Sequence, residues 1–184
     1  MNGFRLVKED SRLQLDLNSL AKGYTVDMFA EYLQGIGCRD YIVEIGGEIC
    51  AAGVNARGNE WRIGVDTPFE GNQSPGEYQQ TVICVSNRAV ATSGNYRRYY
   101  TDAEGNKITH TISPKTGKSV VSRLLSATVV ADLCVEADAM ATMFMAMGDK
   151  AAVALAEELK DEGVEVYFVL ANGEEYEILS TLEK

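Results

Sequence analysis

CVEADAMATMFMAMG, residues 134–148, is the stretch around which we expect the rest of the chain to fold. It predicts a helix, and between residues 139 and 147 its only residue that is not apolar is Thr142. Such a helix has little room for a solvent-facing side, so we expect it to be buried on most of its sides. Asp132 lies where it could cap the helix start, and Gly148 lies where it could end the helix.

Two oxygen-bearing side chains interrupt this apolar stretch. Asp138 and Thr142 are four residues apart, so they lie on one face of the helix. Burying a carboxylate is costly unless it is paired or bound to a metal, and an oxygen pair at helical spacing is half of a hard-cation site. The alternative is structural: Asp138 caps a helix that starts later, and Thr142 bonds back to a carbonyl. Taken alone, the stretch favours this alternative, because carboxylates are common in first helical turns.

The composition limits the ligands that the chain can bind. The chain has 184 residues, of which 46% are hydrophobic, enough for one sizeable core. The formal net charge of −10 argues against binding nucleic acid or an anionic membrane surface. The four cysteines form no CxxC pair and indicate no zinc or redox motif. Because the net charge is negative, an anionic ligand would need a local cation to hold it.

Strand patterns outnumber helical ones along the chain. We expect a first hairpin from residues 4–7 and 13–17, and a last hairpin from residues 164–170 and 176–179 around an Asn-Gly turn. A helix with a charged end is predicted at residues 150–162. Antiparallel hairpins with about three inserted helices predict an α+β layered sandwich of mainly antiparallel sheet, not a doubly wound α/β fold. The other predicted strands are residues 41–52, 61–65, 81–86, 107–112 and 124–131.

A first helix is predicted from a cap at Asn18 or Ser19 to about residue 34. Its start presents free N–H groups and a positive dipole, which favour anions, and Lys22 adds a charge while Gly23 allows close approach. The alternative is an ordinary capped amphipathic helix. Its apolar positions at helical spacing are Leu20, Tyr24, Met28, Phe29 and Leu33.

Two glycine-containing stretches are further candidates for ligand binding. Gly46 and Gly47 interrupt the strand pattern of residues 41–52, which indicates a bulge or a close backbone approach to a ligand. Small hydroxyl residues at 91–94 precede Arg97 and Arg98, a combination that would suit a diphosphate. The alternative for the second stretch is an exposed edge strand with solvated arginines.

His110 is the only histidine in the chain, so any imidazole chemistry must use it. It lies just before a turn that contains proline and glycine, residues 113–117, where functional residues often occur. A lone histidine on a strand is nevertheless more often structural.

Five separated stretches resemble, in their order, the motifs of the ApbE family, the FAD:protein FMN transferases. The resemblance implies a Mg²⁺-dependent enzyme that transfers the FMN part of FAD onto a threonine hydroxyl of an acceptor flavoprotein through a phosphoester bond, with AMP leaving. Some members instead hydrolyse FAD to FMN and AMP. The five stretches are LDLNSLAKGYTVD at 15–27, VEIGGEI at 43–49, ATSGNYRRYY at 91–100, HTISPKTG at 110–117 and EADAMAT at 136–142.

The resemblance also implies roles for individual residues. It assigns the metal to Asp138, Thr142 and the carbonyl of Ala21, and catalysis to His110. Some members have a further carboxylate just before the threonine, where this chain has Ala141. The positions that fall in the FAD-contacting motifs are Asn18, Lys22, Tyr24, Gly46, Gly47, Ser93, Gly94 and Ile112.

The implied chemistry agrees with the composition. A hydroxyl that attacks a diphosphate needs the phosphate charge neutralised, and a hard cation on oxygen ligands provides this in an acidic protein. A general base or positioning group is also needed, and His110 is the only imidazole.

Family members usually carry a substantial segment before the first motif, whereas 14 residues precede it here. We therefore expect residues 1–184 to form one domain, the C-terminal bulk of the family fold. The resemblance further implies a bacterial cell-envelope protein, periplasmic or at the outer face of the membrane, whose lipid anchor would lie outside this chain. An FAD pyrophosphatase and a non-catalytic FAD-binding remnant are the alternative functions.

Overall fold

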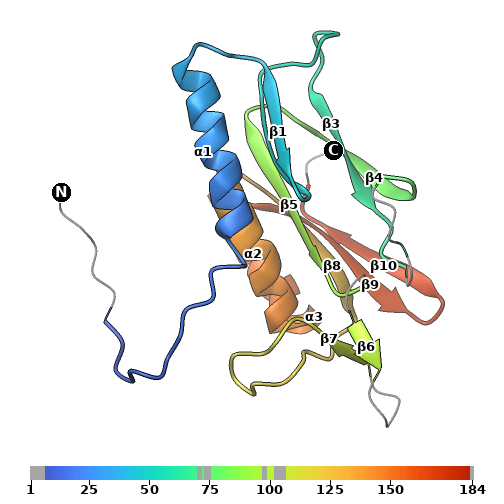
Figure 1. Cartoon of the computed structure of the whole chain (residues 1–184). Coiled ribbons are helices and arrows are strands. Elements are labelled where there is room, and N and C mark those ends of the chain that lie inside the picture. The colour runs from blue at the N-terminus through green and yellow to red at the C-terminus, as the bar shows by residue number, and fades with distance from the viewer. Residues whose placement is uncertain (1–6, 70–71, 73–75, 97–98, 102–106, 183–184) are drawn as a thin grey trace.

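A six-stranded antiparallel sheet forms the centre of the protein (Figure 1). The computed structural model describes residues 7–69, 72, 76–96, 99–101 and 107–182. Three α-helices accompany the sheet in this part, so the predicted α+β architecture is confirmed. The sheet has the order β1 (Tyr41–Ile45), β2 (Glu48–Ala52), β5 (Arg88–Gly94), β8 (Leu124–Ala131), β9 (Glu165–Asn172) and β10 (Glu175–Ser180).

The helices cover one face of this sheet, and a two-stranded hairpin packs on the other. Helix α1 (Ala21–Gly35) contacts β1 and β2, and α2 (Cys134–Met147) contacts β5 and β8. Helix α3 (Asp149–Leu159) follows α2 and is continued by a short 3₁₀ turn at Lys160–Glu162. The hairpin consists of β3 (Trp61–Asp66) and β4 (Gln79–Val85), and a small separate hairpin consists of β6 (Tyr99–Thr101) and β7 (Lys107–Thr109).

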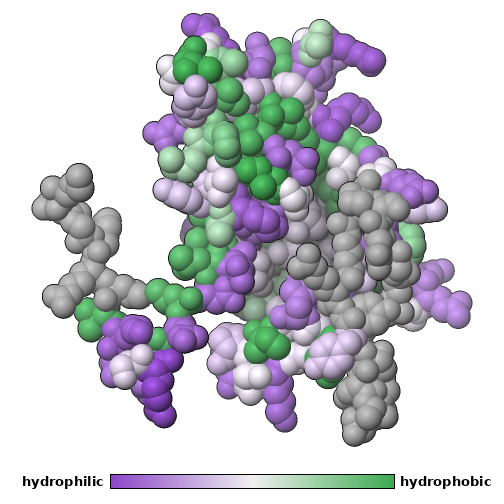
Figure 2. All heavy atoms as spheres, viewed as in Figure 1, coloured by the Kyte–Doolittle hydropathy of each residue, from purple (hydrophilic) through white to green (hydrophobic). Residues whose placement is uncertain are grey.

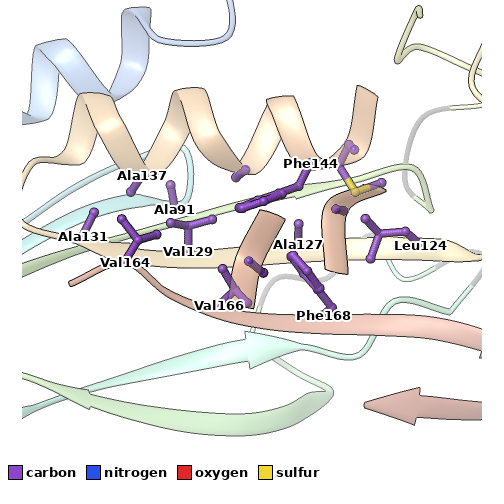
Figure 3. Packing of buried hydrophobic residues seen from close by; sticks show 14 of the residues in the cluster. Ala91, Leu124, Ala127, Val129, Ala131, Ala137, Phe144, Val164, Val166 and Phe168 are labelled. Carbon is purple, nitrogen blue, oxygen red and sulfur yellow. The ribbon is translucent and has the colours of Figure 1, made fainter. Parts of the chain in front are cut away.

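Alternation along β8 sends its side chains into two different core layers. Val129 belongs to the layer beneath the helices, whereas Val130 belongs to the layer beneath the β3–β4 hairpin. In the helix layer, the rings of Phe144 and Phe168 meet edge to face with centroids 5.1 Å apart (Figure 3). Burial on both faces explains why β8 is apolar along most of its length.

Helix α2 is buried on most of its sides, as its sequence predicts. The sheet lies on one side of it, and α1 and α3 contact it on others. Gly148 ends the helix at a positive φ of 79°, which confirms the predicted terminus. In the described part of the chain, no helix has both the length and the apolar character needed to cross a bilayer.

The second strand of the predicted first hairpin does not form. Residues 13–17 contain no strand, and residues 4–6 lie outside the described part of the chain. Leu13, Leu15 and Leu17 are all exposed, and Figure 1 shows their segment running away from the body. Alternation alone does not make a strand, because strand stability depends on packing against neighbouring strands, and none pairs with this segment among the described residues.

Helix α1 buries a different face from the one that its large apolar residues predict. Its buried residues are Gly23, Val26 and Ala30. Tyr24 and Phe29 are 56% and 53% exposed, and apolar surface shows over α1 in Figure 2. The predicted cap at Asn18 or Ser19 is also wrong, because the helix begins after Leu20 and has no side-chain cap.

The close approach of α1 to α2 explains this choice of face. A Cβ atom at Gly23 would lie 2.7 Å from the carbonyl carbon of Cys134 and 2.8 Å from the Cα of Val135. Only a residue without a side chain fits at this contact, so the small face of α1 packs inward.

The paired glycines form a turn instead of the predicted interruption of one strand. Gly46 and Gly47 join β1 and β2 as a two-residue hairpin loop, and Ile45 pairs with Glu48 across it. Both glycines have positive φ, 62° and 99°, which this kind of tight turn requires.

Replacing Gly23 with alanine is expected to lower the free energy of unfolding by about 2 kcal/mol or more, because the added methyl group pushes α1 away from α2. Urea unfolding monitored by circular dichroism measures this. Gly35→Ala is the matched control in the same helix, since among the described residues no atom outside its own stretch of helix lies within 4 Å of the added Cβ. It should be neutral or stabilising by up to about 1 kcal/mol. Equal effects of the two substitutions would contradict the close packing described for Gly23.

Candidate functional site

The start of α1 meets the first turns of α2 at a buried carboxylate. The backbone N–H of Gly23 donates to Asp138 Oδ2 over 3.0 Å, and Asp138 is only 3% exposed. The first and the last of the five sequence motifs, more than a hundred residues apart, therefore meet at Asp138.

A second carboxylate, which belongs to α1, caps α2. Asp27 accepts hydrogen bonds from the backbone N–H groups of Cys134 and Val135, each over 2.8 Å. The predicted cap, Asp132, is wrong: its side chain is 86% exposed and lies 3.4 Å from Arg88. Helix caps are sought among residues next to the helix, so sequence reasoning missed Asp27. The sequence feature that could have pointed to Asp27 is its spacing: it lies four residues after Gly23 and therefore on the same face of α1.

Thr142 faces β5, one turn further along α2. Its hydroxyl lies 3.1 Å from the hydroxyl of Ser93, which stands near the end of that strand. Asp138 and Thr142 therefore share one face of α2, as their spacing predicts, and Ser93 adds a third side-chain oxygen from the sheet.

Glu48, the first residue of β2, is a buried residue that sequence reasoning did not single out. It is 2% exposed and forms an ion pair with Lys22 of α1. Its Oε2 atom has no hydrogen-bond partner within the described ranges. A Cβ atom at Gly46 would lie 3.5 Å from Lys22 Cδ and 3.7 Å from this Oε2, so the hairpin turn comes close to the pair.

Burial sets the electrostatics of both carboxylates. It raises the pKa of Asp138 above the usual value, while the Gly23 N–H and the Lys22 charge act in the opposite direction. It also raises the pKa of Glu48, which the pairing with Lys22 opposes and the charge of Asp138 reinforces. Each carboxylate is therefore stabilised when positive charge approaches it.

The donor atoms suit a hard cation such as Mg²⁺. The carboxylate of Asp138 and the hydroxyl of Thr142 are oxygen ligands of the kind that Mg²⁺ takes. Glu48 Oε2 is a buried oxygen for which the described residues supply no hydrogen-bond partner. The third predicted ligand, the Ala21 carbonyl, accepts a hydrogen bond from Thr25 Oγ1 over 2.7 Å. Within the described ranges, no three histidine, cysteine, aspartate or glutamate side chains form a metal-binding group by themselves.

His110 lies on the surface in a bend just after β7, and its two neighbours are anchored. The Thr111 hydroxyl donates to Asn95 Oδ1 over 2.7 Å, and the Thr109 N–H donates to Ser119 Oγ over 2.9 Å. Asn95 is two residues beyond Ser93, so the histidine motif is tied to the end of β5.

Hydrogen bonds and one ion pair thus connect all five motifs. Lys22 joins the first motif to the second through Glu48, and Gly23 joins the first to the fifth through Asp138. Ser93 and Asn95 join the third motif to the fifth and the fourth. Stretches that the sequence spreads over residues 15–142 therefore form one connected set of contacts.

The remaining residues that the sequence predicts to contact the ligand differ in their surroundings. Asn18 and Tyr24 are exposed, as is Ile112, which makes an isolated bridge to Ser119. Gly94 is a packing glycine, because a Cβ there would lie 2.7 Å from the ring of Tyr96. The two arginines proposed to suit a diphosphate, Arg97 and Arg98, lie outside the described residues.

Removing the carboxylate that caps α2 should destabilise the protein. Asp27→Ala is expected to lower the free energy of unfolding by about 1–2 kcal/mol, because two backbone N–H groups at the start of α2 lose their acceptors. Denaturant unfolding measures the change. Asp132→Ala, the control at the exposed position, should stay within about 0.5 kcal/mol of the unsubstituted protein. A larger loss for Asp132→Ala than for Asp27→Ala would contradict the assignment of the cap.

Comparison with known proteins gives one consistent result. The family model described as "ApbE family" matches residues 1–168. The FAD:protein FMN transferase of Vibrio cholerae is 40% identical over 157 residues, which cover 85% of this chain and 46% of that protein. The Escherichia coli K12 protein of the same name is 32% identical over 171 residues, which cover 93% of this chain and 46% of that protein.

Solved structures agree with the sequence relatives. The flavin transferase ApbE from Vibrio cholerae superposes with a TM-score of 0.80 at 34% identity, covering 98% of this chain and 54% of that one. The apo form of the Pseudomonas stutzeri flavinyl transferase ApbE gives a TM-score of 0.77 at 33% identity, covering 91% and 49%. The chain thus spans about half the length of these relatives. The five connected motifs, the fold and the family match together establish that the chain belongs to the ApbE family.

Proposed function

We propose that the chain acts in Mg²⁺-dependent protein flavinylation, in which the FMN part of FAD is transferred to a threonine hydroxyl of an acceptor flavoprotein and AMP is released. The observation that carries this proposal is the connected set of contacts that joins the five motifs, within which the first motif holds Asp138. The relatives named FAD:protein FMN transferase support the same reaction class.

Asp138, Thr142 and the Ala21 carbonyl would hold the Mg²⁺ ion. When bound, the ion would neutralise negative charge on the FAD diphosphate. A hydroxyl nucleophile could then approach the phosphorus atom. Asp138 is held in place by the Gly23 N–H, and Thr142 by Ser93, so the protein orients both oxygens before the ligand binds.

The chain's own groups would then act on the diphosphate and on the acceptor. Lys22, whose side chain is 47% exposed, supplies positive charge at the start of α1. The threonine oxygen forms a bond to the FMN phosphorus as the bond from that phosphorus to the AMP oxygen breaks, and AMP leaves with the electron pair. His110 accepts the proton of the threonine hydroxyl. Its exposed position leaves it accessible to a protein acceptor.

The direct test incubates the purified chain with FAD, Mg²⁺ and a threonine-containing acceptor peptide. The expected result is a flavin-labelled peptide together with released AMP, both depending on Mg²⁺. AMP release that needs no peptide would instead identify water as the acceptor and the chain as an FAD pyrophosphatase. FAD binding without AMP release under any of these conditions would contradict the proposed reaction.

Asp138→Asn is expected to reduce Mg²⁺-dependent transfer by about a hundredfold or more, because a neutral amide replaces the metal-binding carboxylate. The amide oxygen can still accept the Gly23 N–H, so circular dichroism should show a folded protein. Glu136→Gln, at an exposed position in the first turn of the same helix, removes the same charge and should leave transfer unchanged. Full activity of Asp138→Asn would refute the metal assignment.

A further inference from the structure

We propose that Glu48 is a positioning residue of this site, which fixes the Lys22 ammonium near Asp138 and biases the site toward binding a cation before the flavin diphosphate. The inference rests on the proposed function for the identity of the ligands. The carboxylate itself is assigned from its burial and its contacts.

The first observation is the unusual state of the Glu48 carboxylate. Its residue is 2% exposed, yet Oε2 has no hydrogen-bond partner among the described residues. Removing a carboxylate from water and leaving one of its oxygens unpaired costs free energy. Such carboxylates are therefore rare unless a hydrogen-bond donor or a cation binds the unpaired oxygen. Its other oxygen pairs with Lys22, which places the unpaired oxygen at the same cluster.

The second observation is the balance of charge within the cluster. Glu48 and Asp138 are both almost fully buried. Among the described residues, Lys22 is the one cation that pairs with Glu48, and its charge also acts on Asp138. Two carboxylates and one ammonium leave an excess negative charge. These three side chains together should therefore attract a divalent cation and repel a diphosphate that arrives without one.

The third observation is the restriction of Lys22 by Glu48 and the hairpin turn. The ammonium is paired with Glu48, and the stem of the side chain passes near Gly46. The next residue, Gly23, holds Asp138 through its N–H. Glu48 on β2 thereby couples the sheet to the start of α1 at the point where the predicted metal ligand is held.

Removing the Glu48 charge should act in opposite directions on the two ligands. Glu48→Gln should raise the Mg²⁺ concentration needed for half-maximal thermal stabilisation about three- to tenfold, because the site loses negative charge. The same substitution should tighten FAD binding in the presence of EDTA by a few-fold, because repulsion of the diphosphate falls. General damage to the site would weaken both, so the opposite signs separate a specific role from a structural one.

Glu44→Gln is the matched control. Glu44 is exposed and lies in the same hairpin, where its Oε1 accepts the Gly47 N–H over 3.0 Å. Glutamine keeps this acceptor while removing the same charge, so both titrations should match the unsubstituted chain. Glu48→Asp retains the charge and should stay closer to the unsubstituted chain in its Mg²⁺ dependence than Glu48→Gln does.

Three results would overturn the inference: no Mg²⁺-dependent stabilisation of the unsubstituted chain, equal behaviour of Glu48→Gln and Glu44→Gln, or weaker binding of both ligands by Glu48→Gln. If Glu48→Gln does not fold, Lys22→Gln replaces it, and both effects should then be reversed. Mg²⁺ should stabilise Lys22→Gln more strongly than the unsubstituted chain, and FAD in EDTA should bind it more weakly. Effects in the same directions as those expected for Glu48→Gln would overturn the inference. Because the Mg²⁺ titration needs no flavin, Glu48 keeps its role if the cation results hold while flavin transfer fails.

Discussion

Helices α1 and α2 meet where Gly23 lies against the backbone of Cys134, and the site depends on this contact. No side chain fits between the helices there, so the Gly23 N–H reaches Asp138, and Asp27 reaches the two free N–H groups at the start of α2. One glycine thus allows two carboxylate contacts that fix the relative position of the helices. The sheet beneath them then adds Ser93 and Glu48 to the same region.

Burial gives these carboxylates their chemical character. A protein with a net charge of −10 does not attract a flavin diphosphate through its overall field. Asp138 and Glu48 are nevertheless both buried almost without access to water. A nearby cation therefore stabilises their charges more strongly than it would in bulk solvent. The proposed metal requirement therefore follows from the same burial that makes the carboxylates costly in its absence.

Local patterns predicted the features that depend on neighbouring residues. The apolar composition of α2 predicted its burial, and the four-residue spacing of Asp138 and Thr142 predicted their common face. Features set by packing between distant segments were not predictable in this way. The Asp27 cap acts across 107 residues, the Glu48–Lys22 pair depends on the β1–β2 hairpin, and the buried face of α1 is decided by contact with α2 instead of by its own large residues.

The central claim, that Asp138 anchors a cation carrying the flavin diphosphate, is tested most directly by a crystal structure of the chain with FAD and Mg²⁺. We expect Mg²⁺ about 2.1 Å from a carboxylate oxygen of Asp138 and bound to the diphosphate. A diphosphate bound away from the crossing of α1 and α2, or a Mg²⁺ ion with no bond to Asp138, would contradict it.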